Sequence, residues 1–314
     1  MPLDPKAKRF LDTLAAMNPP SALALSVEER RAALAHLMSF CGPAREVAAV
    51  DQLELPGPGG ALVVRAYTPA GAHTDEHLPG MVYFHGGGLV AGSLDTHDPV
   101  CRALSNVSGC RVLSVDYRLA PEHRFPAAVA DGCAAMEWIA AHAGELLLDR
   151  QRLGISGDSA GATLAAVICQ MLAPRGQVPV AFQFLLCPIM DFAAESESRR
   201  SLARGYLVDR DTLEHDLKHY LPVDTDRTDP RISPLRAADV SHLPPTAIHT
   251  AEYDPLRDEG RSYAERLQQA GVRTLYRCHP GMIHLFYGMG GLITYAGAAF
   301  EQMGADIRSL LAPP

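Results

Sequence analysis

Short apolar runs alternate with longer segments of helical periodicity over most of the chain from residue 48 onward. Strands are predicted where apolar residues run together, at 61–67, 81–84, 111–115, 152–156, 181–187, 246–250 and 273–278. Amphipathic helices are predicted between them, at 97–107, 126–143, 159–173, 257–270 and 297–311. This alternation is typical of an α/β protein with a mostly parallel central sheet flanked by helices. Such a sheet binds ligands at the carboxyl ends of its strands, so the residues that follow the strands are the functional candidates.

Two parts of the chain depart from this alternation. Residues 7–17 and 27–40 show helical apolar spacing before the first predicted strand. Residues 190–224 are polar, are predicted to be largely helical, and interrupt the alternation between two strands. An insertion after the carboxyl end of a strand can form a lid over a site, but a solvated surface excursion explains the composition equally well.

The composition indicates a globular chain with a buried hydrophobic core and argues against one class of partner. Hydrophobic residues make up 47% of the 314 residues and charged residues 20%, which excludes a disordered chain. Aromatic residues are only 6%, against 26 glycines and 24 prolines, so we expect an aliphatic, alanine-rich core with many turns. The formal net charge of −8 and the absence of any run of four basic residues argue against a general nucleic-acid binder.

The cysteine pattern indicates a reducing compartment, and the apolar stretches argue against membrane insertion. The seven cysteines include no CxxC pair, so neither a disulfide framework nor a zinc site is predicted. Charged residues interrupt residues 1–17, which therefore lack the apolar region of a signal peptide. No apolar stretch approaches the roughly 20 residues that span a bilayer. We expect a cytoplasmic protein without stable membrane insertion and without a metal.

The sharpest local signal is the motif Gly157-Asp158-Ser159-Ala160-Gly161. It follows the predicted strand 152–156 and opens the predicted helix 159–173. In this strand–turn–helix context, the glycines allow a tight turn that strains the backbone of Ser159 and presents its hydroxyl. Ser159 is therefore a candidate nucleophile, and the alternative is an ordinary helix N-cap.

A second glycine motif, His85-Gly86-Gly87-Gly88, follows directly after the predicted strand 81–84. Backbone N–H groups of Gly87 and Gly88 can approach a ligand oxygen without interference from side chains. Together with the N–H of Ala160, they are candidate donors of an oxyanion hole. A phosphate-binding loop is the alternative, but the motif lacks the Lys-Ser/Thr ending of a P-loop and the spacing of GxGxxG.

A serine nucleophile needs a general base, and the base needs an orienting acid. In the chain order serine, acid, histidine, the acid is expected after a late strand. Asp254 stands there, with Glu252 and Asp258 as rivals, although an Asp before a proline is also typical of a helix N-cap. His279 and His284 both qualify as the base, and their spacing does not separate them.

Together these motifs resemble those of the bacterial esterases of the hormone-sensitive lipase group, in the α/β-hydrolase superfamily. Beyond the two glycine motifs, the resemblance rests on Asp116-Tyr117-Arg118-Leu119-Ala120-Pro121-Glu122-His123, Phe125-Pro126-Ala127-Ala128, Asp254-Pro255-Leu256-Arg257-Asp258-Glu259-Gly260 and Gly281-Met282-Ile283-His284. It extends from about residue 45 to the end of the chain.

The resemblance implies an α/β-hydrolase fold with a helical cap. The implied catalytic domain is residues 46–189 and 225–314, and the implied cap is residues 1–45 and 190–224. The resemblance also selects among the candidates, because it implies a serine carboxylesterase with these residues: catalytic Ser159, His284 and Asp254, and oxyanion donors Gly87, Gly88 and Ala160. It further implies that residues 116–118 and Glu122 support the oxyanion loop.

The expected reaction is hydrolysis of short- to medium-chain acyl esters through an acyl-enzyme intermediate. The expected partner is a small-molecule ester, with no metal or organic cofactor and no nucleic acid. Amide, aryl-formamide or carbamate hydrolysis by the same residues is the alternative. A non-catalytic small-molecule receptor is disfavoured because all three triad positions are filled. Dimers through an edge strand are frequent in the family, so the resemblance allows a homodimer.

Two positions depart from the family pattern. Leu89 stands where an aromatic residue usually follows the glycines, and Leu285-Phe286 replaces the common Gly-Phe after the histidine. We expect Leu89 to reshape the pocket, and Leu89→Phe to shift the preferred ester size in a kcat/KM series. An unchanged series would reject that link.

Overall fold

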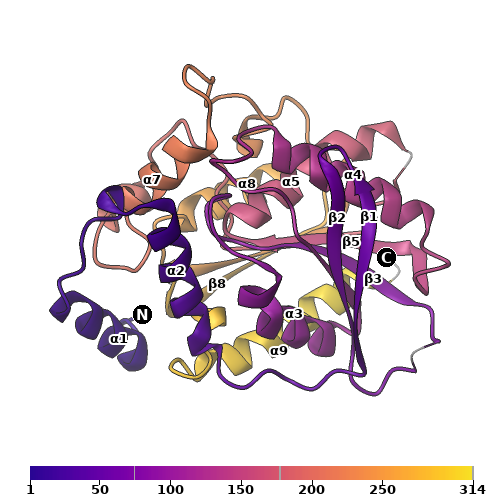
Figure 1. Ribbon diagram of the computed structural model, residues 1–314, viewed down its shortest axis with the longest axis horizontal. Helices are drawn as coiled ribbons and strands as arrows, with labels where there is room; N and C mark the ends of the chain where they lie inside the picture. Colours follow the sequence, from indigo (N-terminus) through magenta and orange to yellow (C-terminus); the bar gives the residue numbers. More distant parts are fainter. Residues whose placement is uncertain (74, 177, 313–314) are drawn as a thin grey trace.

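The computed structural model describes residues 1–73, 75–176 and 178–312, which build one sheet with helices on both of its faces (Figure 1). The strands within this part of the chain are β1 (Ala49–Gly57), β2 (Gly60–Thr68), β3 (Leu78–Phe84), β4 (Arg111–Val115), β5 (Leu148–Asp158), β6 (Gln183–Leu186), β7 (Thr246–Tyr253) and β8 (Thr274–Ile283). Strands β2 to β8 correspond to the predicted strands, with differences at their ends.

The sheet order is β1-β2-β4-β3-β5-β6-β7-β8. The pairs β1–β2 and β2–β4 are antiparallel, and the remaining neighbours are parallel. The predicted mostly parallel sheet is therefore confirmed. Strand β1 was not predicted, because it is an edge strand whose polar residues are mostly exposed and whose sequence lacks a continuous apolar run.

The helices cover both faces of this sheet. The α-helices are α1 (Pro5–Ala16), α2 (Val27–Met38), α3 (Leu94–Ser108), α4 (Ala127–Ala141), α5 (Ala160–Leu172), α6 (Glu197–Ser201), α7 (Arg210–Tyr220), α8 (Arg257–Gln269) and α9 (Tyr295–Leu311). Short 3₁₀ turns are η1 (Ala22–Ala24), η2 (Ser39–Cys41), η3 (Ala173–Arg175), η4 (Pro234–Arg236) and η5 (Phe286–Met289). Figure 1 shows α3 and α9 on one face of the sheet and α4, α5 and α8 on the other.

The segment 190–224 is less helical than predicted. Only α6 and α7 are α-helical within it, and turns and bends make up most of the remainder. Gly205 and Leu207 lie between the two helices with φ of +86° and +75°, a left-handed backbone that an α-helix cannot contain. Polar composition alone did not reveal this break. Helix α7 packs against η1, so this segment lies beside the N-terminal residues.

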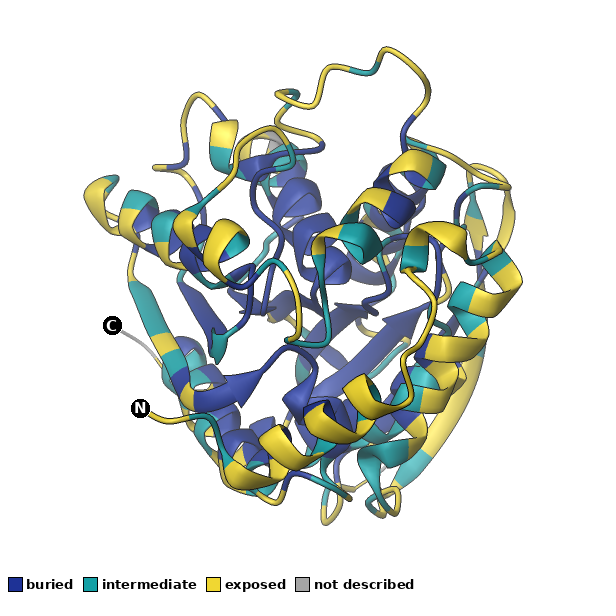
Figure 2. Cartoon of the chain, turned by 90° about the vertical axis from the view of Figure 1, so that its left-hand side faces the viewer, coloured by how far each residue is buried: buried dark blue, intermediate teal, exposed yellow. Residues whose placement is uncertain are grey.

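Figure 2 shows the buried centre of the molecule around the sheet, with exposed residues on the outer faces of the helices. As predicted, many core residues are alanine, valine, leucine or isoleucine. The largest fully buried side chains are nevertheless aromatic: Tyr67, Tyr83, Tyr117, Tyr263, Tyr287, Phe84, Phe182, Phe184 and Phe286. The small aromatic content is thus concentrated in the interior.

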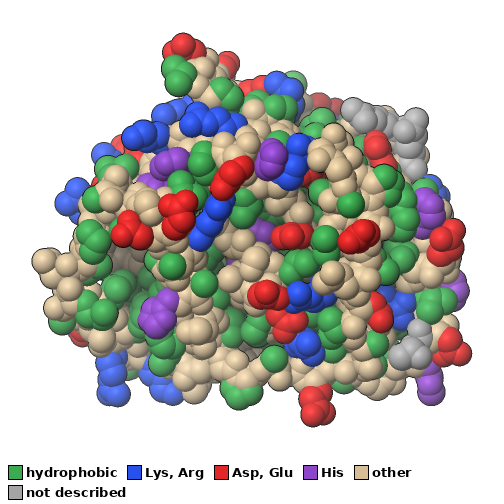
Figure 3. Space-filling view, in the orientation of Figure 1, with side chains coloured by type: hydrophobic (Ala, Val, Ile, Leu, Met, Phe, Trp, Pro, Cys, Tyr) green, Lys and Arg blue, Asp and Glu red, His purple; other side chains and the backbone are tan. Residues whose placement is uncertain are grey.

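The surface bears charges of both signs. On the face shown in Figure 3, basic and acidic side chains are interspersed. Across the part of the chain that the structure covers, no helix has both the length and the apolar character to cross a membrane.

Candidate active site

Ser159 lies at the sharp turn between β5 and α5, with φ of +53° and ψ of −124°. Positive φ is unusual for a residue with a side chain, so the predicted strained conformation is confirmed. Both flanking positions require glycine because other backbone atoms approach them closely. A Cβ at Gly161 would lie 2.1 Å from the carbonyl oxygen of Phe84, and one at Gly157 would lie 2.5 Å from the backbone of Gly161. Ser159 does occupy the N-cap position of α5, but its side chain makes no capping hydrogen bond, so capping does not explain the serine.

Three residues distant in sequence form a continuous hydrogen-bonded chain at this turn. Ser159 Oγ lies 3.1 Å from His284 Nε2, and His284 Nδ1 lies 2.7 Å from Asp254 Oδ2. His284 and Asp254 are fully buried. The other carboxylate oxygen of Asp254 accepts the backbone N–H of Leu256 at 2.8 Å, so the carboxylate also caps the turn that leads into α8. Asp254 is not the N-cap of α8, because Leu256 takes that position.

The structure separates the two candidate histidines. Strand β8 continues to Ile283, so His284 follows its end directly, whereas His279 lies inside the strand. His279 contacts His249 (Nε2 to Nδ1, 3.0 Å) and the hydroxyl of Tyr295 at 3.1 Å, away from Ser159. The predicted strand, residues 273–278, stops short of the observed end of β8 at Ile283. Gly281 adopts φ of +73° within the strand, whose pairing with β7 shifts register nearby.

The two rival acids have other partners. Glu252 Oε2 accepts the backbone N–H of Gly281 at 2.7 Å. Asp258 accepts the backbone N–H of Ser198 at 2.8 Å and pairs with Arg257 at 2.9 Å. Of the three candidate acids, Asp254 is therefore the one that meets His284.

The glycine motif after β3 forms a loop beside Ser159. Gly87 and Gly88 have φ of +119° and +68°, and both line the same pocket as Ser159 and His284. A Cβ at Gly87 would lie 2.3 Å from the carbonyl oxygen of Ala91, so a side chain is excluded there. Ala160 is the first residue of α5, where backbone N–H groups point out of the helix end. The three candidate oxyanion donors thus lie around the turn that carries Ser159.

Asp158, the residue before Ser159, anchors this loop, which sequence reasoning did not anticipate. Its buried carboxylate accepts hydrogen bonds from the backbone N–H of Gly86 at 2.8 Å, the Tyr83 hydroxyl at 2.5 Å and the Tyr287 hydroxyl at 2.8 Å. Burial alone would raise the pKa of Asp158, but His97 and these hydroxyls outweigh it and hold the pKa well below its usual range. The signal available in the sequence was only a carboxylate inside the serine motif.

Contacts from the neighbouring motif reach the same loop. The Tyr117 hydroxyl donates to the carbonyl oxygen of His85 at 2.7 Å. Glu122 pairs with Arg31 of α2 at 2.7 Å, and Arg31 also donates to the carbonyl oxygen of Val90 at 2.9 Å. These contacts agree with the supporting role that the resemblance implied for Tyr117 and Glu122, whereas Arg118 pairs with Asp131 at 2.7 Å.

The pocket above Ser159 encloses about 530 Å³, part of it open to solvent. Its walls come from the loops after β3, β6 and β8 and from the helices α2 and α7. Most wall residues are apolar: Leu34, Ile189, Phe192, Val208, Leu213, Leu217, Tyr220 and Leu285. Arg30 and Asp216 are the Arg, Lys, Asp or Glu residues among its lining, and neither was predicted, because helical periodicity alone does not show which face meets a pocket.

Leu89 does not line this pocket. It is buried with φ of +62° and lines a separate, small hollow. Phe192 and Tyr220 line both cavities. An effect of Leu89 on the substrate would therefore be transmitted through these two side chains, and the expectation that Leu89 shapes the pocket directly is corrected.

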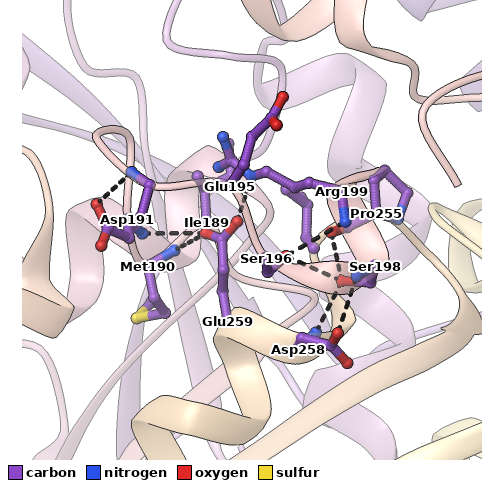
Figure 4. Close-up of polar contacts among 12 residues, drawn as sticks. Ile189, Met190, Asp191, Glu195, Ser196, Ser198, Arg199, Pro255, Asp258 and Glu259 are labelled. Atoms are coloured by element: carbon purple, nitrogen blue, oxygen red, sulfur yellow. Dashed lines mark hydrogen bonds and ion pairs between the residues drawn. The ribbon is translucent and has the colours of Figure 1, made fainter. Parts of the chain in front are cut away.

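The segment between β6 and α7 is tied to the loop that carries the candidate acid (Figure 4). The Ser198 hydroxyl donates to the carbonyl oxygen of Pro255 at 2.8 Å. Buried Glu259 accepts the backbone N–H groups of residues 190 and 191 at 2.9 and 3.0 Å and pairs with Arg199. Figure 4 shows Arg199 reaching across from α6 to Glu259 on α8.

Among the described residues, one group of three side chains has ligand atoms close enough to hold a metal ion. Cys187, Asp254 and His284 offer ligand atoms within 4.8 Å of one another. Asp254 and His284 are already hydrogen-bonded to each other. Burial raises the pKa of the Cys187 thiol well above its ordinary value, which disfavours the thiolate that binds metals. We therefore do not assign a metal to this group.

Comparison with known proteins agrees with this geometry. A family model described as the alpha/beta hydrolase fold matches residues 81–288. The carboxylic ester hydrolase LipN of Mycobacterium tuberculosis is 41% identical over 89% of this chain and 76% of its own. The ethyl acetate hydrolase of Pseudomonas putida is 39% identical over 82% of this chain and 81% of its own.

Solved structures are equally similar. An alpha/beta hydrolase enzyme from the metagenome of Lake Arreo superimposes with a TM-score of 0.94 at 40% identity, covering 98% of both chains. A hyperthermophilic esterase from Pyrobaculum calidifontis gives a TM-score of 0.92 at 38% identity, covering 99% of this chain and 100% of its own. With this fold, these motifs and these relatives, the chain belongs to the α/β-hydrolase family, among its carboxylic ester hydrolases of the hormone-sensitive lipase group.

Proposed function

We propose that this chain is a serine carboxylesterase that hydrolyses short- to medium-chain acyl esters, with Ser159 as nucleophile, His284 as base and Asp254 as the orienting acid. One observation carries the proposal. The Ser159–His284–Asp254 hydrogen-bonded chain, at 3.1 and 2.7 Å, opens into a pocket that Gly87 and Gly88 also line.

In the first half of the reaction, Ser159 Oγ attacks the ester carbonyl carbon while His284 Nε2 takes its proton. The Asp254 carboxylate fixes the imidazole tautomer and stabilises the imidazolium. The carbonyl oxygen becomes an oxyanion, which accepts hydrogen bonds from the backbone N–H groups of Gly87, Gly88 and Ala160. The tetrahedral intermediate collapses as the C–O bond to the alcohol breaks, and His284 protonates the departing alkoxide.

In the second half, His284 takes a proton from a water molecule as that water attacks the acyl carbon. The second tetrahedral intermediate uses the same oxyanion donors. It collapses as the bond to Ser159 Oγ breaks, His284 returns the proton to the serine, and the carboxylic acid leaves. Every proton in this cycle passes through one imidazole, so no metal or organic cofactor is needed.

The apolar walls of the pocket support an acyl or alkyl group of modest size as the substrate part. The relatives named ethyl acetate hydrolase and arylesterase are consistent with small esters. We propose that p-nitrophenyl esters with acyl chains from two to about eight carbons are turned over.

The test measures kcat/KM for p-nitrophenyl acetate, butyrate, octanoate and palmitate, together with an aryl formamide. We expect a maximum among the shorter esters and weak turnover of palmitate and of the formamide. Ser159→Ala should remove turnover, while Ser201→Ala, at an exposed serine of α6, should keep it. Turnover by the Ser159→Ala variant would overturn the assignment of Ser159 as the nucleophile.

We also propose that residues 1–45 and 190–224 act as a cap on the domain formed by residues 46–189 and 225–314. This proposal is supported by α2 and α7, one from each cap segment, which contribute Leu34 and Leu217 to the pocket walls. Limited proteolysis with and without a bound phosphonate inhibitor tests this. A cap predicts that the inhibitor protects sites within these two segments, and equal cleavage would count against it.

We propose a cytoplasmic location on the basis of the seven cysteines, which are all free thiols in the described structure. Cell fractionation followed by detection of the protein tests this, and recovery from the membrane or the extracellular fraction would overturn it.

A further inference from the structure

An ion pair interrupts the otherwise apolar wall of the pocket. Arg30 of α2 donates from Nη2 to Asp216 Oδ2 at 2.7 Å and from Nε to Asp216 Oδ1 at 3.0 Å. The two side chains are only 11% and 8% exposed. His215 Nδ1 lies 3.0 Å from the same Oδ1. This bidentate pair joins helix α7 to the N-terminal residues, and both of its members line the pocket that contains Ser159.

The carboxylate of Asp216 lies directly against the candidate oxyanion loop. A Cβ built on Gly88 would lie 1.9 Å from Asp216 Oδ2, so this oxygen contacts the Gly88 backbone itself. Gly88 is one of the proposed oxyanion donors. A bare carboxylate in this position would repel the negative charge that forms on the substrate oxygen, and screening by water is weak in a buried site.

We propose that Arg30 is a positioning residue of the esterase reaction, which masks the Asp216 charge so that the loop of Gly87 and Gly88 can stabilise the oxyanion. The inference rests on the proposed function, because it concerns the oxyanion of ester hydrolysis. Asp216 holds α7 in place through Arg30, and the paired charges present no net charge to the reacting oxygen.

The competing explanation is that the pair is only a tie between α2 and α7. The two explanations differ when both partners are removed. If the pair only ties α2 to α7, kcat should fall equally when Arg30 is lost, when Asp216 is lost and when both are lost. Masking predicts that the loss of Arg30 alone is the harmful change, because it leaves the carboxylate uncompensated, and that removing the carboxylate as well reverses the harm.

The experiment is a double-mutant cycle on p-nitrophenyl butyrate hydrolysis. Arg30→Gln is expected to lower kcat by about 100-fold with KM changed by less than about 3-fold, an effect like the loss of one oxyanion donor. Asp216→Asn is expected to cost less than about 10-fold, because it removes the repelling charge together with the tie. Arg30→Gln combined with Asp216→Asn is expected to regain at least about 10-fold in kcat over Arg30→Gln alone.

Asp211→Asn is the matched control. Asp211 lies on the same helix and accepts a hydrogen bond from Ser21 of the N-terminal residues at 2.6 Å, but it is not among the pocket-lining residues. It should leave kcat within about 2-fold of wild type. Arg30→Lys keeps the charge and loses the bidentate geometry, so it should retain kcat within about 10-fold of wild type. This variant still tests the proposal if Arg30→Gln does not fold.

Three results would overturn the masking role. They are a double variant as slow as Arg30→Gln, an Arg30→Gln variant with kcat within about 3-fold of wild type, and an Arg30→Lys variant with a loss of about 100-fold. Failure of the proposed function looks different, because wild-type protein would then show no turnover that depends on Ser159.

Discussion

At the residue scale, the candidate site depends on backbone conformations that few residues adopt. Ser159, Gly87 and Gly88 all have positive φ, and the glycines at 157 and 161 are required by contacts closer than a Cβ permits. These constraints place the serine hydroxyl and the loop amides on the same pocket before any substrate binds. The consequence is that very small side-chain changes here should have large effects on turnover.

Gly88→Ala tests this constraint. The added methyl group would meet Asp216 Oδ2 at 1.9 Å in a left-handed backbone, so the loop or the Asp216 carboxylate beside it must shift, and we expect kcat to fall by roughly 100-fold or more. Gly109→Ala is the matched control, because Gly109 has φ of +73° and open space around it. It should cost about 1 kcal/mol of unfolding free energy and no activity. Equal kcat losses in the two variants would contradict the role of the loop.

Asp254→Asn tests the proposed acid. Asparagine keeps an oxygen for the N–H of Leu256 but loses the charge that orients and stabilises the imidazolium, so we expect kcat to fall by roughly 10⁴-fold with the fold intact. Asp258→Asn, at a rival position in the first turn of α8, should change kcat by less than about 10-fold. A loss in Asp258→Asn that matches the loss in Asp254→Asn would reassign the acid.

At the element scale, the ends of strands and the ties between loops decide where the reactive side chains meet. Strand β8 carries His284 to the pocket because it continues through Gly281 to Ile283. The loop with Asp254 is held from the other side by α6, through the hydrogen bond from Ser198 to the carbonyl oxygen of Pro255. The site therefore depends on contacts between elements that are remote along the chain.

Ser198→Ala tests the tie between α6 and this loop. Its buried hydroxyl donates to Pro255 and accepts the backbone N–H of Asp258 at 3.2 Å, so the variant leaves two buried polar groups without this partner. We expect the unfolding free energy, measured by urea titration, to fall by about 1–3 kcal/mol. Ser201→Ala, on the same helix with an exposed hydroxyl, should cost less than about 0.5 kcal/mol. Indistinguishable urea curves for the two variants would show that the tie adds no stability.

At the scale of the whole molecule, a buried polar cluster joins β7, β8 and α9 on the far side of the sheet from α4 and α5. His249 contacts His279 at 3.0 Å and Asp306 at 3.0 Å, and His279 contacts the Tyr295 hydroxyl at 3.1 Å. Burial lowers the pKa of His279 to about 3 and that of His85, in the oxyanion loop, to about 4. Both rings are therefore held neutral in the folded protein at pH values where the unfolded chain binds protons.

His279 and His85 should each lower the stability of the protein as the pH falls from about 6.5 toward 4. In this window, His279 and His85 become protonated in the unfolded chain but stay neutral in the folded protein. Each therefore contributes up to about 1.4 kcal/mol per pH unit to the decline in unfolding free energy. His279→Gln should reduce that slope by about one proton, measured by chemical denaturation at several pH values. Tyr295→Phe, which removes a partner and keeps the histidine, should retain the slope. An unchanged slope in His279→Gln would contradict the neutral buried ring.

The sequence by itself determined the features that rest on local chain chemistry. The alternation of apolar runs and amphipathic helices predicted the mostly parallel sheet, because side-chain periodicity follows the backbone geometry of each element. The turn at Ser159 was predicted because its glycines stand two positions before and after it, within one local motif. The oxyanion loop was recognisable for the same reason, as three consecutive glycines directly after a strand.

The tertiary structure decided which remote residues meet. Periodicity and spacing left His279 and His284 open, and only the resemblance selected between them; in the folded chain, the continuation of β8 brings His284 to Ser159. The hydrophobic periodicity of the sequence did not reveal Asp158 as anchor of the loop or the Arg30–Asp216 pair in the pocket wall. Such contacts join segments up to 186 positions apart, and their formation depends on how helices and strands pack against one another, which local hydrophobic periodicity does not encode.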